Sequence, residues 1–209
     1  MYILKELIKS NEGFSLIELI TAVLFVVFLN SSPTLYDNSS NLILNAFFSW
    51  LFLTLLICIA FIDIKSFWIP QGLINFGFLS GFLYLIVICF FNDKFIDLYL
   101  LLRGVSSSLI SFFIFESLRY LAKYIFKKDA IGKGDSKLVA MLALWLGPIG
   151  TLFAVGISYI FAAIYCLIGL SLNLLRFRQV IPFAPFLSLG GLLIWLIGND
   201  FVIYKILRF

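Results

Sequence analysis

Long apolar runs dominate this sequence, and several of them are long enough to cross a lipid bilayer. A helix needs about 20 apolar residues to span the hydrocarbon layer. Hydrophobic residues make up 63% of the 209 residues and charged residues only 12%. A soluble domain is usually about 45–50% apolar and about 25% charged. The composition therefore excludes an ordinary soluble domain and predicts an integral membrane protein.

The apolar runs predict an all-α, polytopic membrane bundle of six to seven helices. Only helices and closed barrels satisfy their backbone hydrogen bonds in lipid, and the sequence lacks the alternating pattern of a barrel. The fifth run is short because Gly147-Pro148 ends it, so we expect it to dip or tilt. The expected spans are Phe14–Leu29, Leu42–Ile62, Gly72–Phe91, Ile96 to about Arg119, Leu138–Gly147, Thr151–Asn173 and Phe183–Gly198.

The basic residues between these runs predict the orientation of the helices. If the N-terminus is inside, eleven Lys and Arg lie on the inner side and three on the outer side, with Arg103 inside the fourth span. Such a bias is typical of cytoplasmic loops, and it accounts for the net charge of +4 without nucleic acid. If the fifth span does not cross the membrane, every later loop lies on the opposite side from the one assigned here. The inner set is Lys5, Lys9, Lys65, Arg119, Lys123, Lys127, Lys128, Lys133, Lys137, Arg176 and Arg178, and the outer set is Lys94, Lys205 and Arg208.

The residue types that are missing restrict the possible chemistry. The sequence contains no histidine, which excludes a Ser-His-Asp triad, a Cys-His pair and a histidine-ligated metal. Its three cysteines, Cys58, Cys89 and Cys166, lie inside apolar runs and form no C-x-x-C pair, so a disulfide scaffold and a zinc ribbon are also excluded. We expect no metal and no cofactor.

Two aspartates at the ends of expected spans are the candidate catalytic residues. Asp63 ends the second span and Asp135 precedes the fifth, so both are expected at the cytoplasmic rim. Acidic residues at a membrane boundary suggest function, although a loop aspartate can simply be solvated. A hydrolase without histidine must use carboxylates. Two close carboxylates share a proton, so one can act as general base on water while the other donates to the scissile carbonyl oxygen.

Two glycines flank Lys133 just before Asp135. Gly132 and Gly134 permit positive φ and a close backbone approach, so a substrate peptide could lie beside Asp135. The alternative interpretation is a flexible loop with a solvated aspartate and a basic membrane-surface patch. The position of the loop, the absence of histidine and the second boundary aspartate favour a catalytic and substrate-binding role.

Three separated segments carry a resemblance to one protein family. They are DIKSFWIP at 63–70, GKGDSKL at 132–138, and IPFAPFL at 181–187 with Gly190-Gly191. Together they resemble the type IV prepilin peptidases, which are membrane aspartyl proteases with a G-x-G-D signature. The resemblance implies that Asp63 and Asp135 are the catalytic pair. Gln71 stands where the family often has Asn, and Lys137 is interpreted as a marker of the inner face.

The resemblance also implies a substrate class and a location. Such enzymes cut leader peptides from prepilins or pseudopilins at the cytoplasmic face of the bacterial inner membrane, in contact with membrane lipids. Bifunctional members carry a domain with paired C-x-x-C motifs and methylate the new N-terminus. This sequence has no such motif, so we expect the peptidase activity without N-methyltransferase activity. Its oligomeric state is left open.

The N-terminal segment resembles a substrate of that family. In the sequence KELIKSNEGFSLIEL, Gly13, Phe14 and Glu18 match the leader glycine, the first mature residue and its fifth-position glutamate. Three interpretations stay open: a self-cleavage site, an uncleaved inhibitory docking segment, or an anchor helix derived from a natural or engineered fusion. The expected organisation is a leader and first helix at 1–30, an extracytoplasmic linker at 31–41 and a peptidase-like domain at 42–209.

Two other functions compete with the leader peptidase. A presenilin-like intramembrane protease shares the G-x-G-D signature but cuts within a helix, whereas both aspartates here are at a boundary. A non-catalytic pilus-assembly component would explain the N-terminal segment, but the rest of the sequence consists of further membrane helices. A generic transporter would leave the two aspartates at one rim without a role.

Overall fold

The computed structural model describes residues 42–91, 96–127, 132–175 and 179–197. These residues form five helices and contain no strand, which confirms the all-α class. The expected first span Phe14–Leu29, the linker at 31–41 and the residues Gly13, Phe14 and Glu18 lie outside this described part. The helices are α3 (Leu42–Ser66), α4 (Gln71–Phe91), α5 (Ile96–Phe126), α6 (Lys133–Ser171) and α7 (Ala184–Ile197).

Four of the described helices, α3 to α6, are long and apolar enough to cross a membrane, and α7 is a shorter apolar helix. Many large apolar side chains stay exposed on the bundle, as in α5, where Phe113 is 65% and Leu102 58% exposed. Lipid, rather than water, is the environment in which such surfaces are stable. The chain is therefore a multi-pass membrane protein.

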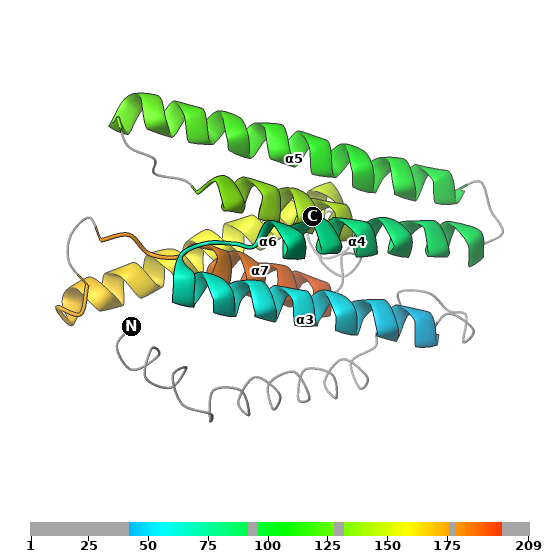
Figure 1. Ribbon diagram of the computed structural model, residues 1–209, viewed down its shortest axis with the longest axis horizontal. Helices are drawn as coiled ribbons and strands as arrows, with labels where there is room; N and C mark the ends of the chain where they lie inside the picture. Colours follow the sequence, from blue (N-terminus) through cyan, green and yellow to red (C-terminus); the bar gives the residue numbers. More distant parts are fainter. Residues whose placement is uncertain (1–41, 92–95, 128–131, 176–178, 198–209) are drawn as a thin grey trace, which may run out of the picture.

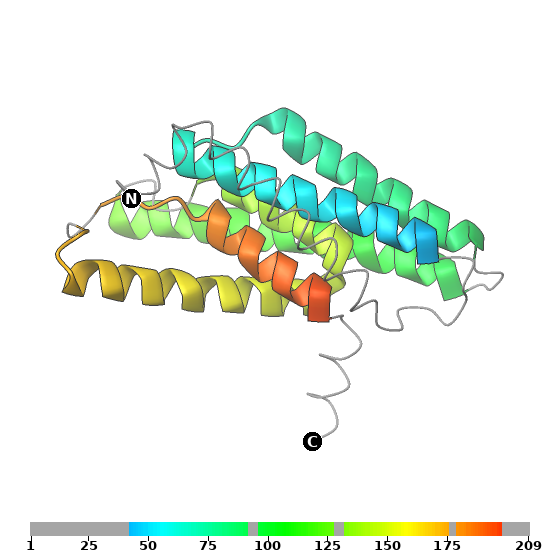
Figure 2. The same cartoon turned by 90° about the horizontal axis from the view of Figure 1, so that it is seen from below.

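Helix α6 differs from the sequence-based expectation, because it joins the expected fifth and sixth spans. The chain bends at Gly147, whose φ of 69° and ψ of −178° are not helical, and Pro148 follows directly. Residues 133–146 and 148–171 then run in opposite directions (Figures 1 and 2). Asp135 and Tyr159, one on each half, are close enough to influence each other electrostatically, which agrees with this fold-back. The two expected spans are thus separate antiparallel segments, joined by a bend instead of a loop.

The ends of two helices were also misplaced by the sequence-based spans. Helix α6 begins at Lys133 instead of Leu138, and α5 continues past Arg119 to Phe126. Gly132 is the N-cap of α6, which places Asp135 in the first helical turn. An acidic side chain is favourable there because it faces the positive end of the helix dipole.

Helix α7 is held by close helix–helix contact and by aromatic packing. It lies between α3 and the second half of α6 (Figure 2). A Cβ atom at Gly190 would come within 2.2 Å of the Ala154 carbonyl oxygen, so only glycine permits this approach. The Trp195 ring packs against Phe52 at 5.1 Å and Trp145 at 5.7 Å between ring centroids. These contacts fix α7 relative to both neighbours.

The topology brings one end of several helices together. The C-terminal end of α3 and the N-terminal ends of α4, α6 and α7 meet at the same end of the bundle, on the left of Figure 1. The three sequence motifs fall at these ends, so the fold gathers segments that are far apart in the chain.

Candidate active site

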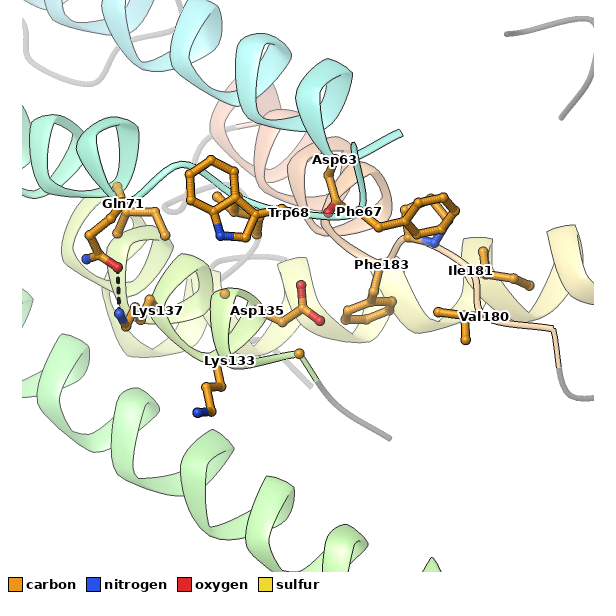
Figure 3. Close-up of a pocket in the computed structure, with 15 residues that line it drawn as sticks. Asp63, Phe67, Trp68, Gln71, Lys133, Asp135, Lys137, Val180, Ile181 and Phe183 are labelled. Carbon is orange, nitrogen blue, oxygen red and sulfur yellow. Dashed lines mark hydrogen bonds between the residues drawn. The ribbon is translucent and has the colours of Figure 1, made fainter. Parts of the chain in front are cut away.

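A cavity of about 490 Å³ opens at this end of the bundle. Its lining comes from three segments: the end of α3 with the α3–α4 connection and the start of α4, the start of α6, and the stretch before α7 (Figure 3). All three sequence motifs therefore contribute to a single cavity. The lining residues are Asp63, Phe67, Trp68, Ile69, Gln71, Ile74, Gly132, Lys133, Gly134, Asp135, Lys137, Val180, Ile181, Pro182 and Phe183.

Asp63 is held at the end of α3 by the start of α7. Its side chain is buried, with 6% of the residue surface exposed. The backbone N–H of Ala184, the first residue of α7, donates a hydrogen bond to Asp63 Oδ2 at 3.2 Å. The first N–H groups of a helix have no partner within the helix, so this carboxylate satisfies one of them. The contact orients Asp63 and anchors α7 at the same time.

Asp135 faces Asp63 from the first turn of α6. Its carboxylate interacts with the backbone N–H of Gly132 and with the carboxylate of Asp63, which is close enough for charge repulsion. The bond to Gly132 resembles a capping box, in which the side chain at the third helical position returns to the N-cap. The structure therefore brings together the two aspartates that the sequence singled out.

The two glycines beside Lys133 line the cavity, but for a different reason than expected. Gly132 has φ −68°, and among the described residues the glycine with positive φ is Gly147, so neither glycine beside Lys133 uses the positive φ that glycine permits. A Cβ at Gly132 would lie 3.0 Å from Asp135 Oδ2, and one at Gly134 would lie 3.0 Å from the Ile69 Cδ1 atom. Close packing explains both glycines.

A polar pair borders the cavity on the side of α4. Lys137 Nζ donates a hydrogen bond to Gln71 Oε1 at 2.5 Å, and Gln71 Nε2 donates to Asn75 Oδ1 at 3.0 Å. The sequence-based interpretation treated Lys137 only as a marker of the inner face. Its ammonium group instead lies in the cavity lining, fixed by Gln71 (Figure 3).

Sequence reasoning did not single out the aromatic residues of the site, among them Phe67 and Tyr159. Phe67, at the end of α3, lines the cavity and has φ +54°. Tyr159 interacts electrostatically with Asp135 and packs on Phe183 at 5.0 Å between ring centroids. The segment DIKSFWIP at 63–70, which carries part of the family resemblance, contains Phe67 and could have drawn attention to it. Tyr159 had no signal, because its position depends on the bend at Gly147.

A second polar cluster stabilises α5 next to the site. Arg119 is buried and forms an ion pair with Glu116, with a 3.0 Å hydrogen bond from its Nε to Glu116 Oε2. Lys133 of α6 interacts electrostatically with Glu116. In the part of the chain that the structure covers, no group of three or more Cys, Asp or Glu residues could hold a metal ion.

These features define a class: a multi-pass helical membrane protein with two carboxylates in one cavity at the end of the bundle. Comparison with known proteins gives the family. The model of the type IV leader peptidase family matches residues 50–167, a stretch that contains both aspartates. The chain belongs to this family.

Individual relatives agree with the family match. The "type 4 prepilin-like proteins leader peptide-processing enzyme" of Escherichia coli O78:H11 is 30% identical over 184 residues, covering 88% of this chain and 61% of the relative. The "prepilin leader peptidase/N-methyltransferase" of Legionella pneumophila is 30% identical over 74% of this chain and 51% of the relative. That of Aeromonas salmonicida is 27% identical over 90% and 59%, respectively. The chain thus spans between half and two thirds of the length of these relatives. No solved structure is significantly similar to it.

Proposed function

We propose that this protein is an aspartyl endopeptidase that removes leader peptides from type IV prepilin-like proteins at the cytoplasmic face of the bacterial inner membrane. The observation that carries the proposal is the meeting of Asp63 and Asp135, from different helices, in one cavity. Membership of the leader peptidase family and the printed names of the relatives support the substrate class.

The chemistry requires the two carboxyl groups to hold one proton between them. The ionised carboxylate takes a proton from a water molecule, whose oxygen attacks the scissile carbonyl carbon. The protonated carboxyl group donates its proton to the carbonyl oxygen, and the tetrahedral intermediate forms. Collapse of this intermediate breaks the C–N bond and protonates the leaving amine. Because the pair titrates as a unit, neither aspartate is assigned the base role alone.

The surroundings of the pair suit direct attack by water. The cavity lining in the described residues contains no Ser or Cys that could form an acyl-enzyme. The Ala184 amide keeps Asp63 in place, and the lack of a side chain at Gly132 keeps the Asp135 carboxylate free of a clash with a Cβ atom. A preorganised pair of this kind lowers the reorganisation needed in the transition state.

Cleavage of a tagged prepilin in membranes tests the proposal. Wild-type protein should cut after the leader glycine, whereas Asp63→Asn and Asp135→Asn should each lower the rate by at least about 10³-fold. Asp97→Asn, near the start of α5 at the opposite end of the bundle, is the matched control and should cut like wild type. Unchanged cleavage by either active-site variant would remove that aspartate from the mechanism.

The membranes prepared for this assay also test whether the protein cleaves its own N-terminal segment. If the Gly13–Phe14 bond is also a substrate, intact mass should show loss of residues 1–13 in wild type and retention in Asp135→Asn. A full-length, active wild-type protein would exclude self-processing and leave the anchor interpretation.

A further inference from the structure

An open groove lies at the end of the bundle opposite the candidate active site. It has a volume of about 780 Å³ and is found where the first turns of α5 pass the bend in α6. Its lining is mostly apolar and contains one charged side chain, that of Arg103. The side chains that line it are Tyr99, Leu102, Arg103 and Ser106 of α5, with Pro148 and Ile149 of α6.

The Arg103 guanidinium group has no partner among the described residues. It lies over the bend, because a Cβ atom at Gly147 would be 3.6 Å from its Nε atom and 3.8 Å from Nη2. The hydrogen bond recorded at Arg103 runs from Ser106 Oγ to the backbone carbonyl oxygen, at 3.2 Å. In the described part of the chain, no hydrogen bond or ion pair reaches the guanidinium group itself. Its five N–H donors therefore need acceptors from elsewhere.

The same helix shows how an arginine is satisfied within the protein. Near its other end, Arg119 forms an ion pair with Glu116, three residues away, and donates hydrogen bonds to it from both Nε and Nη2. The residue three positions from Arg103 in the groove is Ser106, whose hydroxyl group is already bonded to the backbone. Helix α5 thus provides a carboxylate for one arginine and leaves the other charge uncompensated.

The depth of Arg103 makes this uncompensated charge costly. Glu116 interacts electrostatically with Lys133 at the start of α6, so the Glu116–Arg119 pair lies level with the end that holds the active-site cavity. Arg103 precedes Arg119 by sixteen residues, a helical rise of about 24 Å, whereas the hydrocarbon layer is about 30 Å thick. The guanidinium group therefore lies inside the far boundary of this layer, where a charge requires a counter-charge or water.

We propose that the groove binds the headgroup phosphate of one anionic phospholipid from the leaflet at this end of the bundle. The planar guanidinium fork matches two phosphate oxygens, which supply the missing acceptors. Leu102 is 58% and Tyr99 66% exposed beside it, so the groove also offers apolar contact for the acyl chains. A lipid with a net negative charge neutralises Arg103, whereas a choline headgroup would bring a second cation. The bound lipid ties α5 to the bend in α6.

Thermal unfolding of the full-length protein, delipidated in detergent, tests this site. We expect dioleoylphosphatidylglycerol to raise the melting temperature by about 5 °C or more at saturation, because it binds the folded state. Dioleoylphosphatidylcholine should give a clearly smaller shift, and inorganic phosphate none. Equal shifts with the two lipids would overturn the anionic preference. A full shift with inorganic phosphate would overturn the lipid as occupant.

Two variants locate the effect in the groove. Arg103→Gln should lose most of the phosphatidylglycerol shift. Lys123→Gln is the matched control, because Lys123 is an exposed cation of the same helix outside the groove, and it should keep the shift. Equal shifts in these two variants would overturn the proposal.

A third variant keeps the test decisive if Arg103→Gln does not fold. Ser106→Glu places a carboxylate in the groove, three residues from Arg103, as Glu116 is from Arg119. We expect its melting temperature without lipid to equal or exceed that of wild type, because the new ion pair satisfies Arg103. The phosphatidylglycerol shift should disappear, since the acceptor position is occupied. A full shift in Ser106→Glu would refute the site.

Discussion

At the scale of single residues, the site depends on backbone groups as much as on side chains. The Ala184 amide holds Asp63, and the Gly132 amide interacts with Asp135. Both amides belong to the first turns of helices, where N–H groups need external acceptors. The two carboxylates therefore also act as helix caps, so that stability and the proposed activity depend on the same contacts.

The double role of Asp63 can be measured. Asp63→Ala removes the acceptor of the Ala184 N–H, whereas Asp63→Asn keeps one. We expect the Ala variant to be less stable than the Asn variant by about 1–3 kcal/mol, the cost of an unsatisfied buried donor. Ala184→Pro removes that donor at a position where proline is tolerated. In this background the difference between Ala and Asn should vanish; if thermal unfolding shows it undiminished, the contact does not stabilise α7.

Gly132 should be sensitive to the smallest possible side chain. A Cβ atom there would lie 3.0 Å from Asp135 Oδ2 and displace the carboxylate from its position. We expect Gly132→Ala to lower kcat by about tenfold to 10²-fold, with little change in melting temperature. Gly72→Ala is the control, because a Cβ at Gly72 meets nothing within 4 Å. Equal activity of the two variants would show that the packing at Gly132 does not position Asp135.

The sequence predicted the two aspartates as site residues, but it did not predict the groups that position their carboxylates. Asp63 and Asp135 are recognisable from their place at the ends of apolar runs and from their motifs. The partners of Asp63 and Asp135 are backbone amides, which any residue except proline supplies, so the sequence contains no sign of them. The left-handed backbone conformation of Phe67 could not be predicted either, since a phenylalanine does not indicate positive φ.

At the scale of helices, the bend in α6 is the element that makes the site possible. It returns the chain toward the end of the bundle where it began, and so brings Tyr159 next to Asp135. Arg103 of α5 lies beside the bend, because a Cβ at Gly147 would be 3.6 Å from its Nε atom. The guanidinium group is thus near the C-terminal end of the first half-helix, where a positive charge is favourable.

The bend provides a matched pair of substitutions in one helix. Gly147 combines φ 69° with ψ −178°, a region that is essentially limited to glycine. We expect Gly147→Ala to destabilise the protein by about 1–3 kcal/mol. Gly156→Ala, where a Cβ meets nothing within 4 Å, should instead stabilise it by about 0.5–1 kcal/mol. Thermal unfolding in detergent measures both, and equal effects would contradict the role of the bend.

The periodicity of the sequence could not predict the bend in α6. Gly147-Pro148 correctly predicted an interruption, and the runs on either side were correctly assigned to separate segments. Whether the chain ends a helix there or turns sharply depends on the packing of 133–146 against α5 and α7. That packing arises from contacts between distant segments, which no local pattern encodes.

At the scale of the whole molecule, the charge distribution distinguishes the two ends of the bundle. The described residues at the end with the cavity include Lys65, Arg119, Lys123, Lys127, Lys133 and Lys137. At the opposite end the described basic residue is Arg103. We therefore propose that the cavity faces the cytoplasm.

Two tyrosines on α5 can report this orientation. Tyr99 and Tyr124 are 66% and 85% exposed and lie near opposite ends of the helix. In a variant without the native cysteines, Tyr99→Cys should react with an impermeant thiol reagent added to intact cells. Tyr124→Cys should react only after the membrane is opened. The reverse labelling pattern would place the cavity outside.

At this scale the sequence was informative about class and order of passes, because apolar run length and basic loops are direct consequences of the bilayer. It could not show that the three motifs share one cavity. Their convergence depends on α7 being inserted between α3 and α6, which needs the close approach at Gly190.

A short helical segment has a consequence for the lipid around it. The first half of α6, residues 133–146, rises about 21 Å against a hydrocarbon layer of about 30 Å. Such hydrophobic mismatch thins the bilayer or lowers the headgroups beside the segment. Since this segment begins at the cavity, the thinning would let water reach the aspartates without a dedicated channel. We expect cleavage to be faster in vesicles of short-chain than of long-chain phosphatidylcholine, and a rate independent of chain length would show that water arrives by another route.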